Sequence, residues 1–131
     1  MIFIGEYEVS FTAPGRIILP KKLRKLLQGD SFILSQGFDE CLAGYDLKDW
    51  ERRVESMIDI SPFEEEKLSR RRFLFSSATH VEIDDQGRFV IPKNHLSFAH
   101  LTDEITIIGV GDHFEVWNTK MWNEYKEKIK V

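Results

Sequence analysis

Near the start of the chain, apolar and polar residues alternate as they do in a strand that is buried on one face. Residues 7–11 show this alternation, and the proline and glycine within residues 12–15 then predict a turn. Residues 16–19 return as a second strand, which ends at Pro20. Because proline favours the first position of a helix, we expect a helix over residues 21–28 with its leucines turned inward.

The same order of elements is predicted to recur. Residues 32–34 and 41–45 form another strand pair, and a helix begins after Asp46. A further helix is expected from about Pro62 towards Ser76. The pattern then restarts with strands over 79–83 and 88–91, a helix from Pro92, strands over 105–108 and 114–117, and a helix capped by Asn118. Each half thus reads strand, strand, helix, strand, strand, helix.

A repeated heptapeptide explains this recurrence. The sequence GRIILPK at residues 15–21 returns as GRFVIPK at residues 87–93, 72 positions later. Matching apolar positions extend on both sides, so a whole supersecondary unit was duplicated. We expect a first repeat over residues 1–58, a connecting helix over 59–77 and a second repeat over 78–131.

The size of each repeat predicts that both halves share one core. A unit of about 55 residues is marginal alone, and the chain of 131 residues is 42% hydrophobic. The predicted fold class is α+β, mainly β with flanking helices. The halves offer limited interior for Tyr45, Trp50, Trp117 and Trp122, so we expect some aromatic surface to be shared between subunits of a homo-oligomer.

The distribution of charge is more informative than its total. A formal net charge of −4 argues against a protein that coats polyanions with its whole surface. Residues 16–25 nevertheless contain no acid and five bases, which are Arg16, Lys21, Lys22, Arg24 and Lys25. A local basic face on an acidic body is typical of a protein that contacts nucleic acid at one place. The basic run over residues 70–72 is better interpreted as a solvated helix face or a contact with a neighbouring subunit.

Motifs for enzyme chemistry are missing from the sequence. The four histidines lack metal-site spacing, and no glycine motif for phosphate binding leads into a helix. Cys41 is the only cysteine, which excludes an intrachain disulfide and a cysteine zinc site and fits a reducing cytoplasm. The apolar residues 1–4 are too few for a signal peptide or membrane span, so we expect an edge strand. We predict no catalytic residue, metal, cofactor, small-molecule substrate or membrane partner.

The turn before each heptapeptide is the informative constellation. In the second copy, Asp84 precedes Arg88 by four residues across a turn that contains Gly87. Such an aspartate can accept turn N–H bonds or pair with the arginine, which holds the guanidinium at the hairpin tip. A single occurrence would be an ordinary turn with a surface ion pair. Because this turn stands in a unit that is duplicated along the chain, we favour its interpretation as the signature of a family.

With these motifs the chain resembles the MraZ family, whose members consist of two SpoVT/AbrB-like halves. The resemblance covers essentially the whole chain and is carried by Asp84-x-x-x-Arg88 with residues 89–92, Gly15-Arg16 with residues 17–20, and residues 107–109, 114–117 and 71–73 leading into Ala78. It implies a swapped-hairpin, barrel-like core and a ring of several chains. It further implies a cytoplasmic, nucleoid-associated regulator that binds short repeated promoter boxes upstream of division and cell-wall genes.

The resemblance places the arginine of each motif on the DNA-facing surface. With the basic helix positions added, the predicted DNA-binding residues are Arg16, Lys21, Lys22, Arg24, Arg88 and Lys93. The predicted turn-stabilising residues are Thr12, Gly15, Asp84 and Gly87. Thr12 departs from the family pattern, which has aspartate there. Threonine can accept a hydrogen bond but cannot form an ion pair, so we expect Arg16 to be less restrained than Arg88.

Two classes of function stay open at this point. The first is a sequence-specific transcription regulator that binds double-stranded DNA. The second is an antitoxin-like or other protein-interaction module, because the SpoVT/AbrB-like fold also supplies antitoxins. An enzyme is a distant third.

Overall fold

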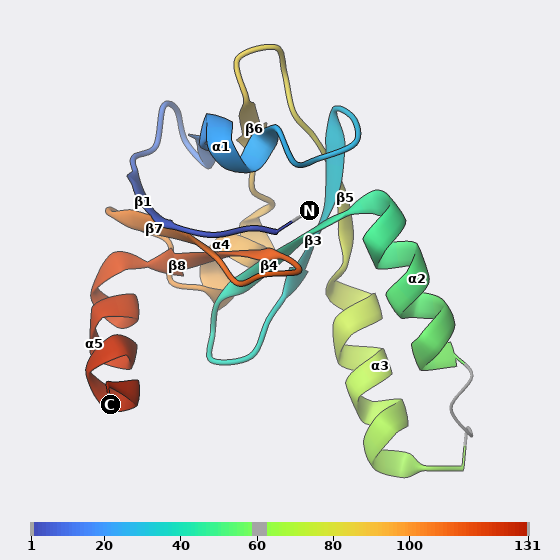
Figure 1. The fold of residues 1–131 in the computed structure, drawn as a ribbon. Helices are drawn as coiled ribbons and strands as arrows, with labels where there is room; N and C mark the ends of the chain where they lie inside the picture. The colour runs from blue at the N-terminus through green and yellow to red at the C-terminus, as the bar shows by residue number, and fades with distance from the viewer. Residues whose placement is uncertain (1, 59–62, 131) are drawn as a thin grey trace.

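The computed structural model describes residues 2–58 and 63–130, and Figure 1 shows how their helices and strands are arranged. The first half contains β1 (Glu6–Val9), β2 (Arg16–Ile18), α1 (Lys21–Arg24), β3 (Ser31–Gln36), β4 (Leu42–Asp46) and α2 (Leu47–Ile58). After α3 (Glu65–Ser77), the second half contains β5 (Thr79–Glu82), β6 (Arg88–Val90), α4 (Lys93–Phe98), β7 (Ile105–Gly109), β8 (Phe114–Asn118) and α5 (Thr119–Ile129). The predicted α+β class and the order of elements are confirmed.

The two halves exchange strands. The antiparallel sheet has the order β1-β7-β8-β4-β3-β5, so β1 of the first half pairs with β7 of the second, and β5 of the second half pairs with β3 of the first. Strands β4 and β8 join the halves at the centre. Backbone N–H and C=O groups of one half therefore satisfy those of the other. The sheet is open, with β1 and β5 at its edges, and a closed barrel stays a prediction.

Strands β2 and β6 form a separate two-stranded ribbon between the halves. The N–H of Leu19 donates to the carbonyl of Gly87 over 2.8 Å, and the N–H of Ile91 donates to the carbonyl of Gly15 over the same distance. The residue that follows each ribbon strand is therefore hydrogen-bonded to the turn glycine of the other half.

A hydrophobic core that includes residues of both halves supports this ribbon. The ring of Phe89 in β6 meets Phe32 in β3 edge to face, with centroids 5.1 Å apart, and Phe32 meets Phe114 in β8 at 5.3 Å. Ile17 of β2 belongs to the same core and is fully buried. Burial of each such side chain contributes about 1.5–3 kcal/mol. The inward face of the ribbon is therefore tied to both halves.

Helix α1 is shorter than the helix predicted over residues 21–28. It ends at Arg24, and the N–H of Leu27 then donates to the carbonyl of Arg24, three residues back, over 3.2 Å. The N–H of Gln28 donates to Oδ1 of the buried Asp46 over 2.9 Å. Because a side chain from β4 takes this donor, the chain leaves the helix early.

Helices α2 and α3 lie side by side and extend away from the sheet (Figure 1). The ring of Trp50 in α2 lies edge-on to Phe75 in α3 with centroids 6.1 Å apart, and Tyr45 of β4 lies 5.3 Å from Trp50. None of the residues of α2 is fully buried. Helix α3 begins at Glu65, and the predicted start near Pro62 lies outside the described residues.

The N-terminal segment reaches the edge of the sheet by a single bridge rather than by a strand. Phe3 pairs with Gly111, and each N–H donates to the other residue's carbonyl over 2.8 Å. Gly5 adopts a φ of 104°, which breaks the extended run before β1. The predicted edge strand is therefore replaced by a bridge within residues 2–4, with β1 as the edge strand, and residue 1 lies outside the described residues.

Helix α5 covers the opposite end of the sheet from α2 and α3 (Figure 1). Trp117 of β8 is buried, with its ring 5.2 Å from Trp122 and 5.1 Å from Tyr125 of α5. Oδ1 of Asn118 accepts the N–H of Met121 over 3.0 Å, which confirms the predicted cap. None of the described helices is both long and apolar enough to cross a membrane.

Candidate nucleic-acid interface

The turn between β5 and β6 holds Arg88 through Asp84. Oδ1 of Asp84 accepts the N–H groups of Gln86 and Arg88, each over 2.9 Å, and Oδ2 accepts Nε–H of Arg88 over 2.6 Å. The backbone N–H of Arg88, ahead of the side-chain bond, lowers the pKa of Asp84 from its usual value, because these donors stabilise the carboxylate. The side chain of Arg88 is therefore oriented at the hairpin tip by a charged partner.

Thr12 occupies the corresponding position in the turn between β1 and β2. Its N–H donates to the carbonyl of Arg16 over 2.8 Å, and its Oγ1 accepts Nε–H of Arg16 over 3.0 Å. In both tips, then, the residue four positions earlier holds Nε of the arginine. A neutral hydroxyl replaces the charge-assisted bond of Asp84, so Arg16 is held more weakly than Arg88.

Both turns contain a glycine in the left-handed region, and the helix of the other half covers it. Gly15 has a φ of 71° and Gly87 a φ of 82°, which residues with a Cβ rarely adopt. A Cβ on Gly87 would also collide with the guanidinium of Arg24, and one on Gly15 would lie 3.4 Å from Cδ1 of Leu96. Arg24 and Leu96 stand at the same position of the repeat. Each half therefore packs its first helix on the other half's turn.

Arg16 and Arg88 project from the same outer face of the ribbon. The register places Arg16 opposite Val90 and Ile18 opposite Arg88. Side chains alternate between the faces of a strand, so these four residues face away from the core, while Ile17 faces into it. Diagonal neighbours in an antiparallel pair lie about 7–8 Å apart. The two guanidinium groups thus start from neighbouring positions on one surface.

A surface groove of about 590 Å³ lies along this face, beside β5. Both Arg16 and Arg88 line it, together with Val90, His80 and Glu82. Its lining includes cationic hydrogen-bond donors and anionic acceptors. Such a mixture matches the edges of bases, which present donors and acceptors, better than it matches a row of phosphates.

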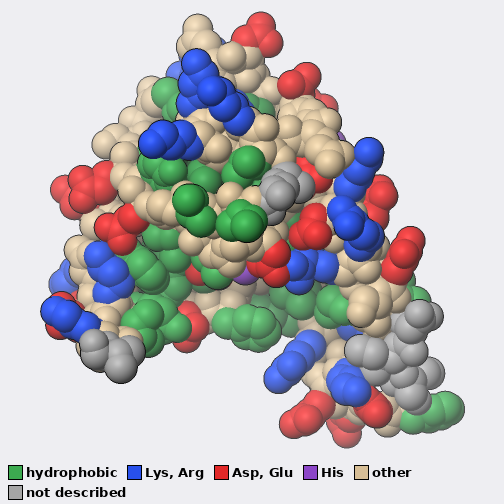
Figure 2. Space-filling view, in the orientation of Figure 1, with side chains coloured by type: hydrophobic (Ala, Val, Ile, Leu, Met, Phe, Trp, Pro, Cys, Tyr) green, Lys and Arg blue, Asp and Glu red, His purple; other side chains and the backbone are tan. Residues whose placement is uncertain are grey.

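The predicted lysines lie next to the ribbon. Lys21 and Lys22 are exposed in α1, and Lys93 is exposed at the start of α4. Figure 2 shows Lys and Arg side chains gathered over α1 at the top of the molecule, close to acidic side chains. Arg24 differs from the lysines, because its Nη1 is buried beside Gly87 without a hydrogen-bond partner. Its side chain supports the second turn.

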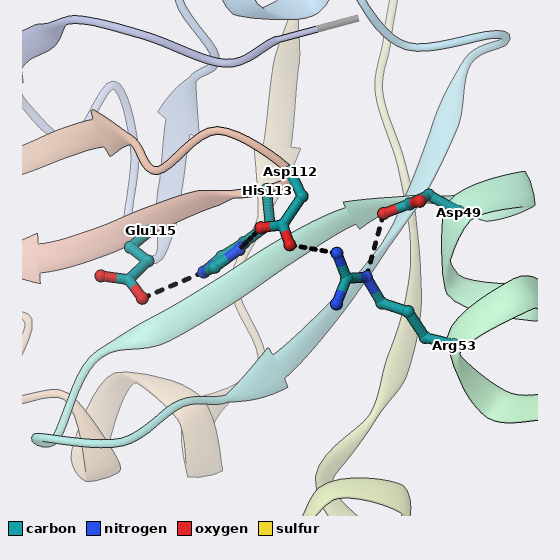
Figure 3. Close-up of polar contacts among 5 residues, drawn as sticks. All are labelled: Asp49, Arg53, Asp112, His113 and Glu115. Atoms are coloured by element: carbon teal, nitrogen blue, oxygen red, sulfur yellow. Dashed lines mark hydrogen bonds and ion pairs between the residues drawn. The ribbon is translucent and has the colours of Figure 1, made fainter. Parts of the chain in front are cut away.

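A second polar cluster, which no sequence pattern predicted, links α2 to the turn between β7 and β8 (Figure 3). Arg53 pairs with Asp49 in its own helix over 3.1 Å and with Asp112 of that turn. His113 lies between Asp112 at 2.6 Å and Glu115 at 3.1 Å. Burial acts to lower the pKa of His113, but the two carboxylates outweigh it and raise that pKa. Arg53 and Asp112 are 59 positions apart, so no local pattern links them and the sequence carries no signal for this cluster.

The thiol of Cys41, which lies close to Glu115, is not activated for reaction. Burial, followed by the charge of Glu115, raises the pKa of the Cys41 thiol well above its usual value, so the thiol stays protonated and is a poor nucleophile. Its Sγ donates to the carbonyl of Phe38 over 3.0 Å. In the described part of the chain, no three histidine, cysteine or acidic residues converge as metal ligands. The cluster is a structural tie between two elements.

The fold and the two turns define a class of protein, in which two similar halves exchange strands and each presents an arginine from a hairpin tip. A family model described as "MraZ protein, putative antitoxin-like" matches residues 2–72 and 74–131. The chain therefore belongs to the MraZ family, and the resemblance seen in the sequence is confirmed. This is a family of regulators and antitoxin-like proteins, not of enzymes.

Proposed function

We propose that the protein is a sequence-specific transcription regulator that binds short repeated boxes in promoter DNA, upstream of division and cell-wall genes. The observation that carries this proposal is the pair of arginines on one face of the β2–β6 ribbon, each with Nε held by its own turn. An arginine whose Nε is held still has two terminal NH2 groups as donors. Paired donors of this kind match O6 and N7 of guanine in the major groove.

The exposed lysines supply a different kind of contact. Lys21, Lys22 and Lys93 lie just beyond the ribbon strands, where a duplex held against Arg16 and Arg88 brings its phosphates. Phosphate contacts fix the register of a protein on DNA and contribute affinity, but they do not read sequence. The ribbon therefore selects the box, and the helices hold the backbone.

Oligomerisation supplies the rest of the selectivity. One arginine contact discriminates between bases by about 1–3 kcal/mol, which is too little to select a promoter. In a ring of chains, successive ribbons meet successive boxes about one helical turn, roughly 10 base pairs, apart, and each engagement raises the effective concentration for the next. Family membership and the strand exchange support a SpoVT/AbrB-like swapped-hairpin core in each subunit of this ring. Such a regulator acts on the nucleoid in the cytoplasm.

The first test combines selection of DNA with a matched pair of arginine variants. Genomic fragments retained by the purified protein are sequenced to identify the box, and one retained fragment is used in mobility shifts. Arg88→Ala should bind this fragment more weakly by about 5- to 150-fold for each box contacted, because every contacting subunit loses one arginine–guanine pair. Arg52→Ala, which removes an exposed arginine of α2, should bind like the wild type. Equal affinities for all three proteins would contradict the proposal.

The family description supports a second candidate, a module that holds a partner protein. A DNA-binding regulator should lose affinity steeply as salt rises yet resist competitor DNA. A protein-interaction module should show neither behaviour. The mobility shift across salt concentrations therefore separates the two candidates.

A further inference from the structure

Two large apolar side chains are exposed on the outer face of the ribbon. Val90 is 60% exposed and Ile18 is 39% exposed. The neighbouring positions Ile17 and Phe89 point the other way and are buried in the core. Formation of the core therefore does not account for an apolar residue at either outer position.

Each of these apolar residues lies directly opposite an arginine. The register pairs Val90 with Arg16 and Ile18 with Arg88. Directly opposite side chains have Cβ atoms about 4.5–5.5 Å apart, and successive bases of a DNA strand are separated by about 3.4 Å along the axis. An arginine and its apolar partner can therefore reach bases at the same step or at neighbouring steps. The arrangement occurs twice in the ribbon, and each pair takes one residue from each half.

We propose that Val90 and Ile18 each contact the methyl group of a thymine, beside the guanine that the paired arginine reads. The C5-methyl of thymine is the apolar group that base pairs present in the major groove. A β-branched side chain can bury this methyl without any change in the ribbon. The inference rests on the proposed function and specifies its ligand, a box in which a guanine lies within about one or two base steps of a thymine.

The charges around the ribbon favour DNA as the occupant of this face over a second copy of the chain. Arg16 and Arg88 flank the apolar pair, and Lys21 and Lys93 are exposed just beyond the strands. Of the acids that line the adjoining groove, Asp84 is already paired with Arg88, and Glu82 belongs to β5 rather than to the ribbon. Pairing of this face with itself would bring four arginines together, and like charges in contact disfavour association. A duplex instead places phosphates on both sides of the groove that receives the ribbon.

The experiment removes the methyl group from the DNA and from the protein separately. Duplexes selected by the protein from a randomised library are resynthesised with uracil in place of one thymine at a time, which removes only the methyl. Val90→Thr and Ile18→Thr retain β-branching while making the outer side chain polar. Ile4→Thr is the matched control, since Ile4 is 68% exposed and lies outside the ribbon. Affinities of each protein for each duplex form double-mutant cycles.

Wild-type protein and Ile4→Thr should bind about fourfold more weakly when the thymine contacted by Val90 becomes uracil, the effect of one methyl removed from an apolar contact. Val90→Thr should lose part of this discrimination, because threonine keeps one methyl group and replaces the other with a hydroxyl. Ile18→Thr should show the same partial loss at a different thymine.

Two outcomes overturn the inference in distinguishable ways. Selective binding in which the wild type does not distinguish thymine from uracil, or in which both threonine variants keep the full discrimination, would remove the methyl contact and leave guanine reading by the arginines intact. Failure to select any duplex would overturn the proposed function together with the inference.

Discussion

At the scale of single residues, the hairpin tips show how a side chain is oriented without being buried. The side chain of Arg88 is 33% exposed and that of Asp84 is 41% exposed, so their ion pair adds little to stability. Its value is geometric, because the carboxylate fixes Nε and also closes the turn. Arg16 obtains a weaker version of this support from Thr12.

A buried histidine should make stability depend on pH. His95 occupies the repeat position of Leu23 and is fully buried. Its Nε2 lies 3.3 Å from Oγ1 of Thr79, and its Nδ1 has no hydrogen-bond partner. Burial lowers the pKa of His95 from 6.5. As pH falls below 6.5, the unfolded chain binds a proton that the folded protein does not, so this residue reduces the free energy of unfolding in acid.

We predict that His95→Leu, which copies Leu23 of the first half, weakens this loss of stability. Between about pH 6.5 and pH 5, the free energy of unfolding should fall less steeply in the variant, by up to about 1.4 kcal/mol per pH unit for one proton. Urea unfolding at several pH values measures the difference. Parallel pH profiles for the two proteins would show that His95 does not titrate in this way.

His113 acts with the opposite sign and is present in both proteins, so it cancels from their difference. Its pKa is raised in the folded state because its pairs with Glu115 and Asp112 outweigh burial. The stabilisation it provides is fully present below pH 6.5 and is lost as pH rises through its higher folded pKa.

At the scale of elements, the sequence predicted what depends on local pattern. The tips around Arg16 and Arg88 and the helices after Pro20 and Pro92 follow from glycine, proline and alternation within a few residues. Strand exchange between the halves does not follow, because the same alternation in residues 7–11 fits pairing with either half. The partner of this strand depends on where its apolar face is buried, and that is decided by the whole fold.

Long-range contacts also explain the elements that differ from prediction. Helix α1 ends early because Asp46, 18 residues away, takes the N–H of Gln28. Arg24, grouped with the surface bases in the sequence, also covers the turn at Gly87 in the other half, and its contact with DNA stays a prediction. Alternation with Phe89 is enough to predict that Val90 faces outward. Its proposed role in DNA recognition depends on Arg16, which only the structure places opposite it.

The lysines of α1 should report on contact with the DNA backbone. Lys21→Ala with Lys22→Ala should lower the slope of log affinity against log salt by about 0.9 for each phosphate that the variant no longer neutralises. Lys120→Ala with Lys128→Ala is a control of equal charge, since both lysines are exposed on α5. Mobility shifts across salt concentrations give the slopes. If the α1 variant and the α5 control have equal slopes, α1 does not lie along the backbone.

At the scale of the whole molecule, the exchanged strands place both arginines on one ribbon. Core residues of both halves pack against its inner face, which ties the two tips to one core. A single ribbon nevertheless offers only a small surface for contact with bases. The proposed function therefore assigns selectivity to several ribbons that act together on one stretch of DNA.

The most direct test of this account is the affinity of the protein for duplexes that carry one, two or more copies of its selected box. Titrations compare the wild type with Arg16→Ala and Arg88→Ala, and light scattering verifies that all three have the same oligomeric state. Wild-type affinity should rise with box number far more than the number of sites alone allows, and both variants should lose specific binding while staying folded and oligomeric. A monomeric wild type, equal affinity for one box and for several, or wild-type affinity in both variants would contradict the account.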